Sequence, residues 1–227
     1  MLVKKWMSKK VVTVDENEAM SNATKLMKEN SIRMLPVLKK NKLTGVITYR
    51  DLKRASASDA TTLDVHELLY LLSNIKVKSI MTKNPITVSP DLTVEETAEI
   101  LLENKISGAP VVDDKGQVVG VITQVDIFKV LISLTGVGKR GIQFAFQVED
   151  RPGSIRDIAD VIRDYGGRMA SILSSYDDVP GGYRKIYIRM YDIDRQKLQS
   201  LMDAFGKTAE LLYFVDHREN LRKTYEE

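Results

Sequence analysis

The chain repeats one stretch of its own sequence, and this duplication constrains the fold more than any single residue does. The sequence of residues 7–52 recurs, at a nearly constant spacing, in residues 81–127. At one constant offset, Met7-Ser8 aligns with Met81-Thr82, and Leu35-Pro36-Val37 aligns with Ala109-Pro110-Val111. After one inserted residue, Gly45-Val46-Ile47-Thr48 and Asp51 meet Gly120-Val121-Ile122-Thr123 and Asp126. Duplicated supersecondary units usually stack so that each copy buries what the other exposes, so we expect a pseudo-two-fold pair with two related clefts.

The length of 227 residues suits about two domains of ordinary size. The duplicated block ends near residue 134 and leaves roughly 90 residues for a second domain. No run of about 18 apolar residues occurs, and no apolar segment follows Met1–Lys5 as it would in a secretory signal. We therefore expect a soluble, cytoplasmic protein with no membrane partner.

Composition argues against several classes of site. The absence of cysteine excludes disulfides and cysteine-ligated metals. The two histidines, His66 and His217, are far apart in sequence and offer little material for a metal or acid-base site. A net charge of +3, from 34 basic and 31 acidic residues, does not supply the dense basic face that attracts nucleic acid.

Each copy reads as a short strand, an amphipathic helix, two strands and a second helix. In the second copy a helix follows Pro90-Asp91, and Ala109–Val112 reads as a buried strand. The turn Asp113–Gly116 then leads to an antiparallel strand over Val118–Ile122 and to a helix that Asp126 opens.

The strand-to-helix junctions are the candidate chemical sites. Thr48 with Asp51, and Thr123 with Asp126, each place a hydroxyl and a carboxylate three residues apart on the first turn of a helix. Unpaired backbone N–H groups at such a terminus favour anions, so a hydroxyl there can help to hold a phosphate while a carboxylate accepts ribose hydroxyls. The alternative is that each pair only caps its helix.

In these motifs the first part of the chain resembles a tandem pair of CBS domains. The resemblance covers residues 1–134 and rests on the Met-Ser/Thr start, the Pro-Val strand and the Gly-Val-Ile-Thr-x-x-Asp end of both copies. It implies repeats at residues 1–58 and 77–134, packed sheet to sheet, with clefts that bind AMP, ADP, ATP or S-adenosylmethionine. It implies no obligatory cofactor. Residues 59–76, rich in leucine, are expected to form a linker helix that packs on the module or on a second copy.

The same resemblance assigns site residues to clefts built from both repeats. Arg33 occupies a place where some members of the family have a phosphate-contacting basic residue, although it could equally be a solvated surface charge. Its counterpart is Ser107, so we expect two unequal clefts. The expected nucleotide-binding residues are Thr48, Asp51, Thr123, Asp126, Arg33, Ser8, Ile32, Thr82, Ile106 and Ser107.

The remainder of the chain predicts a βαββαβ order. Residues 142–148 alternate apolar and polar residues as a strand with one buried face does, and residues 155–162 have helical spacing. With Asp150-Arg151-Pro152-Gly153-Ser154 at the first strand-helix junction and Gly166-Gly167 after the helix, residues 141–216 resemble an ACT domain of ferredoxin-like fold. The resemblance implies an amino acid bound near that loop; alternatively, the Pro-Gly pair only makes a tight turn. Residues 217–227 read as a charged tail, either a solvated helix or a fraying terminus.

The expected architecture is therefore α+β, with two CBS repeats followed by an ACT domain. This combination resembles acetoin-utilisation type bacterial regulatory proteins and favours a non-catalytic sensor of nucleotides, and of an amino acid. An enzyme acting on nucleotides is the less favoured alternative, because no nucleophile-base pairing or metal-ligand cluster occurs. A DNA-binding transcriptional regulator is the other alternative, but the sequence shows neither a helix-turn-helix nor a basic stripe. Since both families characteristically pair, we expect a homodimer or a higher homo-oligomer.

Overall fold

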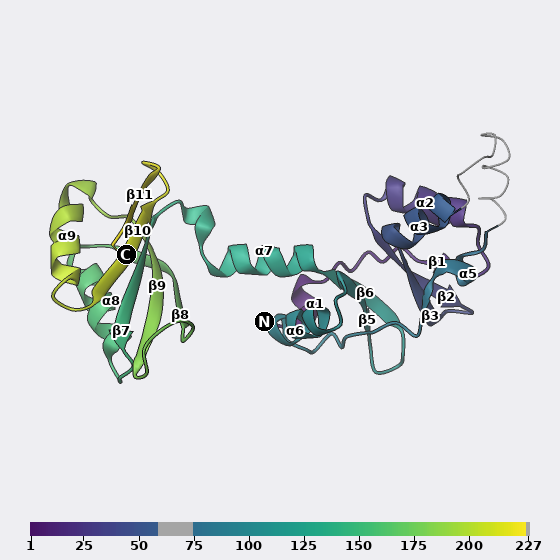
Figure 1. Ribbon diagram of the computed structural model, residues 1–227, viewed down its shortest axis with the longest axis horizontal. Coiled ribbons are helices and arrows are strands. Elements are labelled where there is room, and N and C mark those ends of the chain that lie inside the picture. The colour runs from purple at the N-terminus through teal and green to yellow at the C-terminus, as the bar shows by residue number, and fades with distance from the viewer. Residues whose placement is uncertain (59–74, 226–227) are drawn as a thin grey trace. The chain divides into compact units, whose positions relative to one another are not determined.

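The computed structural model describes residues 1–58 and 75–225, which form two compact units (Figure 1). The first unit is Met1–Phe128 and the second is Lys129–Glu227. Most of the expected linker helix at 59–76 lies outside the described residues. Among the helices that the structure describes, none is long and apolar enough to span a membrane.

The two repeats contain helices and hairpins in the same order, as the duplication predicts, but their short strands β1 and β4 occupy different positions of the repeat. The first repeat consists of α1 (Val3–Trp6), β1 (Val14–Asp15), α2 (Met20–Glu29), β2 (Met34–Lys39), β3 (Lys42–Thr48) and α3 (Tyr49–Ser58). The second consists of α5 (Val77–Ile80), β4 (Thr82–Lys83), α6 (Val94–Glu103), β5 (Gly108–Val112), β6 (Val118–Thr123) and α7 (Gln124–Leu134).

The segment at the start of each repeat pairs first with the sheet of the other repeat. Residues 8–14 and 82–88, which we call the lead-in segments, each cross from one sheet to the other. Thr82 pairs with Val46 on β3 of the first repeat, and Val88 then pairs with Val111 on β5 of its own repeat. In the first copy, Ser8 pairs with Val121 on β6, and Val14 with Val37 on β2. Each sheet therefore contains backbone from both repeats.

The short helices before the lead-in segments are exchanged in the same way. The Val3 N–H donates to the Leu92 carbonyl at 2.9 Å, and its counterpart Val77 donates to Glu18, also at 2.9 Å. Because donors and acceptors in these two bonds are counterparts in the alignment of the copies, the pseudo-two-fold relation extends to individual backbone groups.

Two glycines allow the lead-in segments to lie close to the sheets. A Cβ at Gly45 would stand 2.6 Å from Met81 Sδ and 2.8 Å from the Thr82 carbonyl oxygen. A Cβ at Gly120 would overlap the side chain of Met7. The methionine that precedes each lead-in segment thus packs directly on a glycine of the other repeat's sheet, where any larger residue would push it away.

Amphipathic helices complete the cores of the repeats. In α2 the buried residues Met20, Ala23 and Met27 follow helical spacing, so one face packs on the sheet around Leu35 and Ile47. The opposite surface of α2 is polar and solvated.

The second unit confirms the predicted βαββαβ order. Its sheet is antiparallel, with strand order β11-β10-β7-β9-β8, and η1 (Val137–Lys139) precedes it. The remaining elements are β7 (Ile142–Glu149), α8 (Ser154–Asp164), β8 (Arg168–Ser175), β9 (Tyr183–Tyr191), η2 (Arg195–Lys197), α9 (Leu198–Phe205), β10 (Glu210–Asp216) and β11 (Leu221–Thr224).

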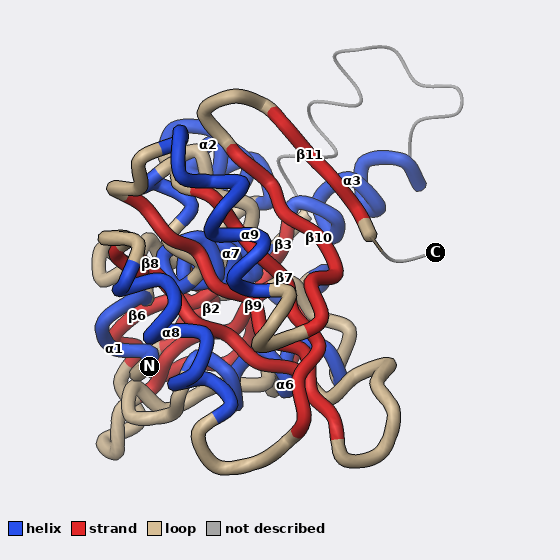
Figure 2. The backbone as a smooth tube through the Cα atoms, turned by 90° about the vertical axis from the view of Figure 1, so that its left-hand side faces the viewer, coloured by secondary structure: helices blue, strands red, loops and turns tan. Residues whose placement is uncertain are grey.

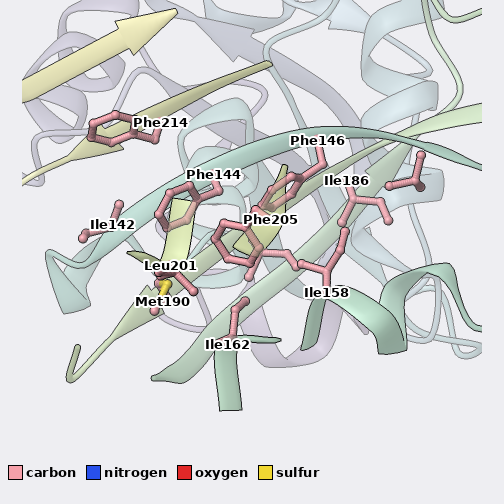
Figure 3. Packing of buried hydrophobic residues seen from close by; sticks show 12 residues of the cluster. Ile142, Phe144, Phe146, Ile158, Ile162, Ile186, Met190, Leu201, Phe205 and Phe214 are labelled. Carbon is pink, nitrogen blue, oxygen red and sulfur yellow. The ribbon is translucent and has the colours of Figure 1, made fainter. Parts of the chain in front are cut away.

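Helices α8 and α9 supply the core of this unit together with one face of the sheet (Figure 3). The Phe205 ring from α9 stands edge-on to two rings of β7, with centroids 5.1 Å from Phe144 and 4.8 Å from Phe146. Ile158 and Ile162 of α8 are fully buried beside them. Such aromatic and aliphatic burial is the main source of stability for a unit of this size.

The charged tail expected at 217–227 is partly wrong, because it contains a strand. β11 runs antiparallel to β10 as a hairpin, with Val215 opposite Arg222 (Figure 2). The turn forms because the Asp216 carboxylate accepts the N–H groups of Arg218 and Glu219. An edge strand such as β10 offers unpaired backbone groups, and β11 satisfies them without needing an apolar pattern.

The expected domain boundary between residues 134 and 141 also shifts, because the first unit ends and the second begins within α7. The end of α7 belongs to the second unit. There the Thr135 carbonyl accepts Arg189 Nε at 2.7 Å and Ser171 Oγ at 2.9 Å. These bonds satisfy the carbonyl of the residue that directly follows the last turn of α7.

Candidate ligand clefts at the strand-to-helix junctions

Thr48 and Asp51 form a reciprocal cap at the start of α3. The carboxylate Oδ2 of Asp51 accepts the Thr48 N–H at 2.9 Å and the Thr48 hydroxyl at 2.6 Å. The Asp51 N–H in turn donates to Thr48 Oγ1 at 3.3 Å. β3 delivers the threonine and α3 delivers the aspartate, so the geometry is local to the junction.

Thr123 and Asp126 repeat this arrangement at the start of α7. Asp126 Oδ2 accepts the Thr123 N–H at 3.0 Å and the Thr123 hydroxyl at 2.8 Å. Asp126 is only 6 % exposed, whereas Asp51 is half-buried. The capping interpretation is therefore confirmed at both junctions. At the first junction it does not exclude ligand binding, because a carboxylate has two oxygens and both bonds to Thr48 engage Asp51 Oδ2.

Backbone pairing brings the segments before the Pro-Val strands to the same junctions. The Arg33 carbonyl accepts the Tyr49 N–H at 2.9 Å, and the Ser107 carbonyl accepts the Gln124 N–H at 3.0 Å. Arg33, with Ile32 before it, therefore lies beside the first junction. Ser107, with Ile106 before it, lies beside the second.

The lead-in segments reach the junctions from the other repeat. Thr82 pairs with Val46, two residues before Thr48. Ser8 pairs with Val121, two residues before Thr123. The predicted residues thus separate into two groups, and each group contains a residue from the other repeat.

The two junctions differ in their linings, as the sequence predicts. Both Arg33 and Ser107 are exposed, so only the first junction carries a solvent-accessible cation at this position. The next residue is Met34 in the first repeat and Gly108 in the second. A Cβ at Gly108 would stand 2.9 Å from the Ile122 carbonyl oxygen, so the second strand pair is packed more closely there.

The predicted effector loop of the second unit is held by internal ion pairs. Arg184 binds Ser154 Oγ at 2.8 Å and Asp150 at 3.4 Å, and Arg151 binds Asp157 at 2.8 Å. Pro152 precedes Gly153, which has a φ of +93° at the start of α8. The tight-turn interpretation of the Pro-Gly pair is consistent with this left-handed glycine.

A recess of about 510 Å³ lies elsewhere in the first unit, and sequence reasoning did not predict it. The start of β3, the β5–β6 turn with the end of β5, and the second lead-in segment line it. The only signal in the sequence is the Asp-Asp-Lys-Gly turn. For metals, the described residues contain no cluster of three or more His, Asp or Glu side chains placed to hold an ion.

Comparison with known proteins identifies the first unit. The protein-family model for the CBS domain matches residues 3–58 and 77–133. A CBS domain-containing protein of Dictyostelium discoideum is 36% identical over 134 residues, which cover 59% of this chain and 92% of that protein. The chain belongs to the CBS domain family. Inosine-5'-monophosphate dehydrogenase of Korarchaeum cryptofilum is also 36% identical, but over only 22% of its length.

Solved structures of CBS pairs are similar to the same part of the chain. The CBS domain pair of protein MJ0100, in complex with 5-methylthioadenosine and S-adenosyl-L-methionine, is 32% identical with a TM-score of 0.50. The similarity covers 58% of this chain and 99% of that one. A Vibrio cholerae protein named for acetoin utilization (AcuB) is 26% identical with a TM-score of 0.51, covering 62% of this chain and 97% of its own. The duplicated unit is thus a CBS pair of α+β fold.

Proposed function

We propose that this chain is a non-catalytic regulatory protein whose CBS pair binds an adenosine-containing ligand at the Thr48–Asp51 and Thr123–Asp126 junctions. The observation that carries the proposal is the doubled Thr-x-x-Asp cap, each copy of which is approached by the lead-in segment of the other repeat. A ligand bound there contacts both repeats and therefore stabilises one arrangement of the pair.

The chemistry of the junctions suits a nucleoside. In the proposed complex Asp51 accepts a ribose hydroxyl through the carboxylate oxygen that does not cap Thr48. The complex of the MJ0100 CBS pair with 5-methylthioadenosine and S-adenosyl-L-methionine supports the choice of adenosine, because both molecules contain it.

The difference between the junctions supports unequal use. The first has a half-buried Asp51 and the exposed cation Arg33, so it favours AMP, ADP or ATP over the cationic S-adenosylmethionine. The second has a buried Asp126 and the small residues Ser107 and Gly108, so it favours a ligand without phosphate.

For the second unit we infer an ACT domain that binds an amino acid near Asp150–Ser154 and pairs in a homodimer. The ferredoxin-like strand order and the Pro-Gly turn after β7 support this assignment. α7 starts at the Thr123–Asp126 cap in the first unit and its last residues belong to the second, so it is the covalent connection between the two units. The combination supports a role like that of acetoin-utilisation regulators.

Titration calorimetry and thermal unfolding with adenosine, AMP, ATP and S-adenosylmethionine test the proposal. A ligand at 100 times its dissociation constant stabilises the protein by about 2.7 kcal/mol. Asp51→Asn keeps one oxygen for the cap but removes the charge and an acceptor, so it should weaken AMP binding about tenfold or more. Asp126→Asn should have a smaller effect on AMP, and Asp114→Asn in the exposed β5–β6 turn is the matched control. Absence of binding by all four ligands would refute the proposal.

A further inference from the structure

The recess between the two hairpin turns lies at the opposite end of the strands from the Thr-x-x-Asp caps. Lys42 lines it at the start of β3, whereas Thr48 stands at the end of that strand. At about 3.3 Å per residue, these positions are roughly 20 Å apart. Gln117, immediately before β6, holds the corresponding place in the second repeat. The recess is therefore separate from both junctions.

The recess lies close to the pseudo-two-fold axis. Lys42 and Gln117 are counterparts in the alignment that pairs Gly45 with Gly120, and both line it. The symmetry operation exchanges these two positions, so a recess that touches both contains or adjoins the axis. Its lining is nevertheless asymmetric, because Asn84 replaces the lysine found at the counterpart position Lys10.

The charges that line the recess are positive. Lys42 and Lys115 are the charged residues of its lining, and no Asp or Glu is among them. Within residues 1–58 and 75–225, neither lysine forms an ion pair. The nearby Asp113 carboxylate accepts the backbone N–H groups of Lys115 and Gln117 at 3.0 and 2.8 Å, so it is engaged in closing the turn.

Neutral groups complete the lining. Asn84 and Gln117 are the amide residues of the lining, and Asn84 is held at a φ of +48°, which is unusual for a residue other than glycine. Leu43 and Pro85 provide apolar wall. The volume of about 510 Å³ falls within the range of roughly 300–1,000 Å³ that small-molecule pockets occupy.

We infer that this recess is a second ligand site, for a small anion that carries a phosphoryl or pyrophosphoryl group. Two ammonium groups without a carboxylate partner and two amides form charge-assisted and neutral hydrogen bonds to phosphate oxygens, and the apolar wall accommodates an organic substituent. Because both hairpins and the second lead-in segment line the site, an anion bound there holds the two repeats together at the end far from the caps.

Pyrophosphate titration of the full chain, by calorimetry and ³¹P NMR, tests this site without a nucleoside. We expect binding that weakens as salt is added, about tenfold or greater loss of affinity in Lys42→Gln and in Lys115→Gln, and no detectable binding in the double variant. Lys28→Gln, on the exposed face of α2, is the control for general charge and should leave the affinity unchanged. Trp6 fluorescence melting verifies that each variant is folded.

The Asp51→Asn and Asp126→Asn variants separate this site from the nucleoside clefts. We expect the double aspartate variant to bind pyrophosphate as the wild type does, and adenosine not to compete. Lack of pyrophosphate binding to the wild type, or equal loss in Lys28→Gln, would overturn the inference while leaving the nucleoside proposal intact. Loss of pyrophosphate binding in the aspartate variants would overturn it by showing a single shared site.

Discussion

The contact between Met7 and Gly120 provides a direct test of the exchanged lead-in segments. A methyl group at position 120 would meet three side-chain atoms of Met7, the farthest of them at 3.2 Å, and nothing else nearer than that. At position 45 the methyl group would meet Met81 Sδ at 2.6 Å but also the Thr82 carbonyl oxygen at 2.8 Å. The first clash is with a flexible side chain alone, and the second involves backbone.

We therefore expect Gly120→Ala and Gly45→Ala each to destabilise the first unit by about 1–3 kcal/mol, the usual effect of overpacking. Met7→Ala should relieve the clash at position 120. A double-mutant cycle should then give a favourable coupling of about 1–2 kcal/mol between Met7→Ala and Gly120→Ala. Met81→Ala should relieve Gly45→Ala only in part, because the Thr82 carbonyl stays in place.

The assay is urea unfolding followed by fluorescence of Trp6, the single tryptophan of the chain, which lies in α1 beside Met7. Gly181→Ala is the control, because a Cβ there would have no neighbour within 4 Å. Additive effects of Met7→Ala and Gly120→Ala would show that the methionine does not pack on this glycine, and would refute the exchange. Equal rescue at both glycines would contradict the predicted role of the Thr82 carbonyl.

Three further predictions concern caps and pH. Thr93 caps α6 through a capping box, whereas its counterpart Ala19 makes no side-chain cap, so Thr93→Ala should destabilise and Ala19→Thr should stabilise the first unit in urea unfolding, each by about 1 kcal/mol. Burial and neighbouring guanidinium groups lower the pKa of His217 below 6.5; the unfolded chain then binds more protons, so the second unit should lose stability as pH falls below 6.5. Near-ultraviolet circular dichroism of its tyrosines should show this loss, and His217→Gln should remove it. Burial acts to raise the pKa of Asp216, but bonds from Arg195 and backbone N–H groups outweigh it and lower the pKa below 3.8. The ionised Asp216 therefore stabilises the second unit, and this stabilisation should vanish only as pH falls through the lowered pKa. Asp216→Asn should flatten the acid limb of the plot of stability against pH.

Features whose partners are near in sequence could be predicted. The Thr-x-x-Asp caps depend on groups three residues apart, and the burial of α8 depends on apolar residues at helical spacing. The βαββαβ order of the second unit likewise follows from local alternation and turns. By contrast, β11 has four exposed residues and no apolar alternation, and it forms because β10 offers a free edge.

The candidate sites show the same division. The duplication predicted two related junctions, and it predicted that Arg33 and Ser107 would make them unequal. It could not predict which residues line the recess between the hairpins, because Lys42 and Lys115 belong to different copies of the repeat and meet only through the packing of the two.

The sequence by itself determined that this protein contains two copies of one unit. It also determined where each copy turns from strand to helix and which side chains cap that turn, because those interactions lie within a few residues. The tertiary structure decided that the lead-in segments cross to the opposite sheets, that Arg189 binds the Thr135 carbonyl within the second unit, and that residues of both hairpins line a basic recess. These features depend on backbone edges and packed surfaces that are far apart along the chain, and no local pattern specifies which of them pair.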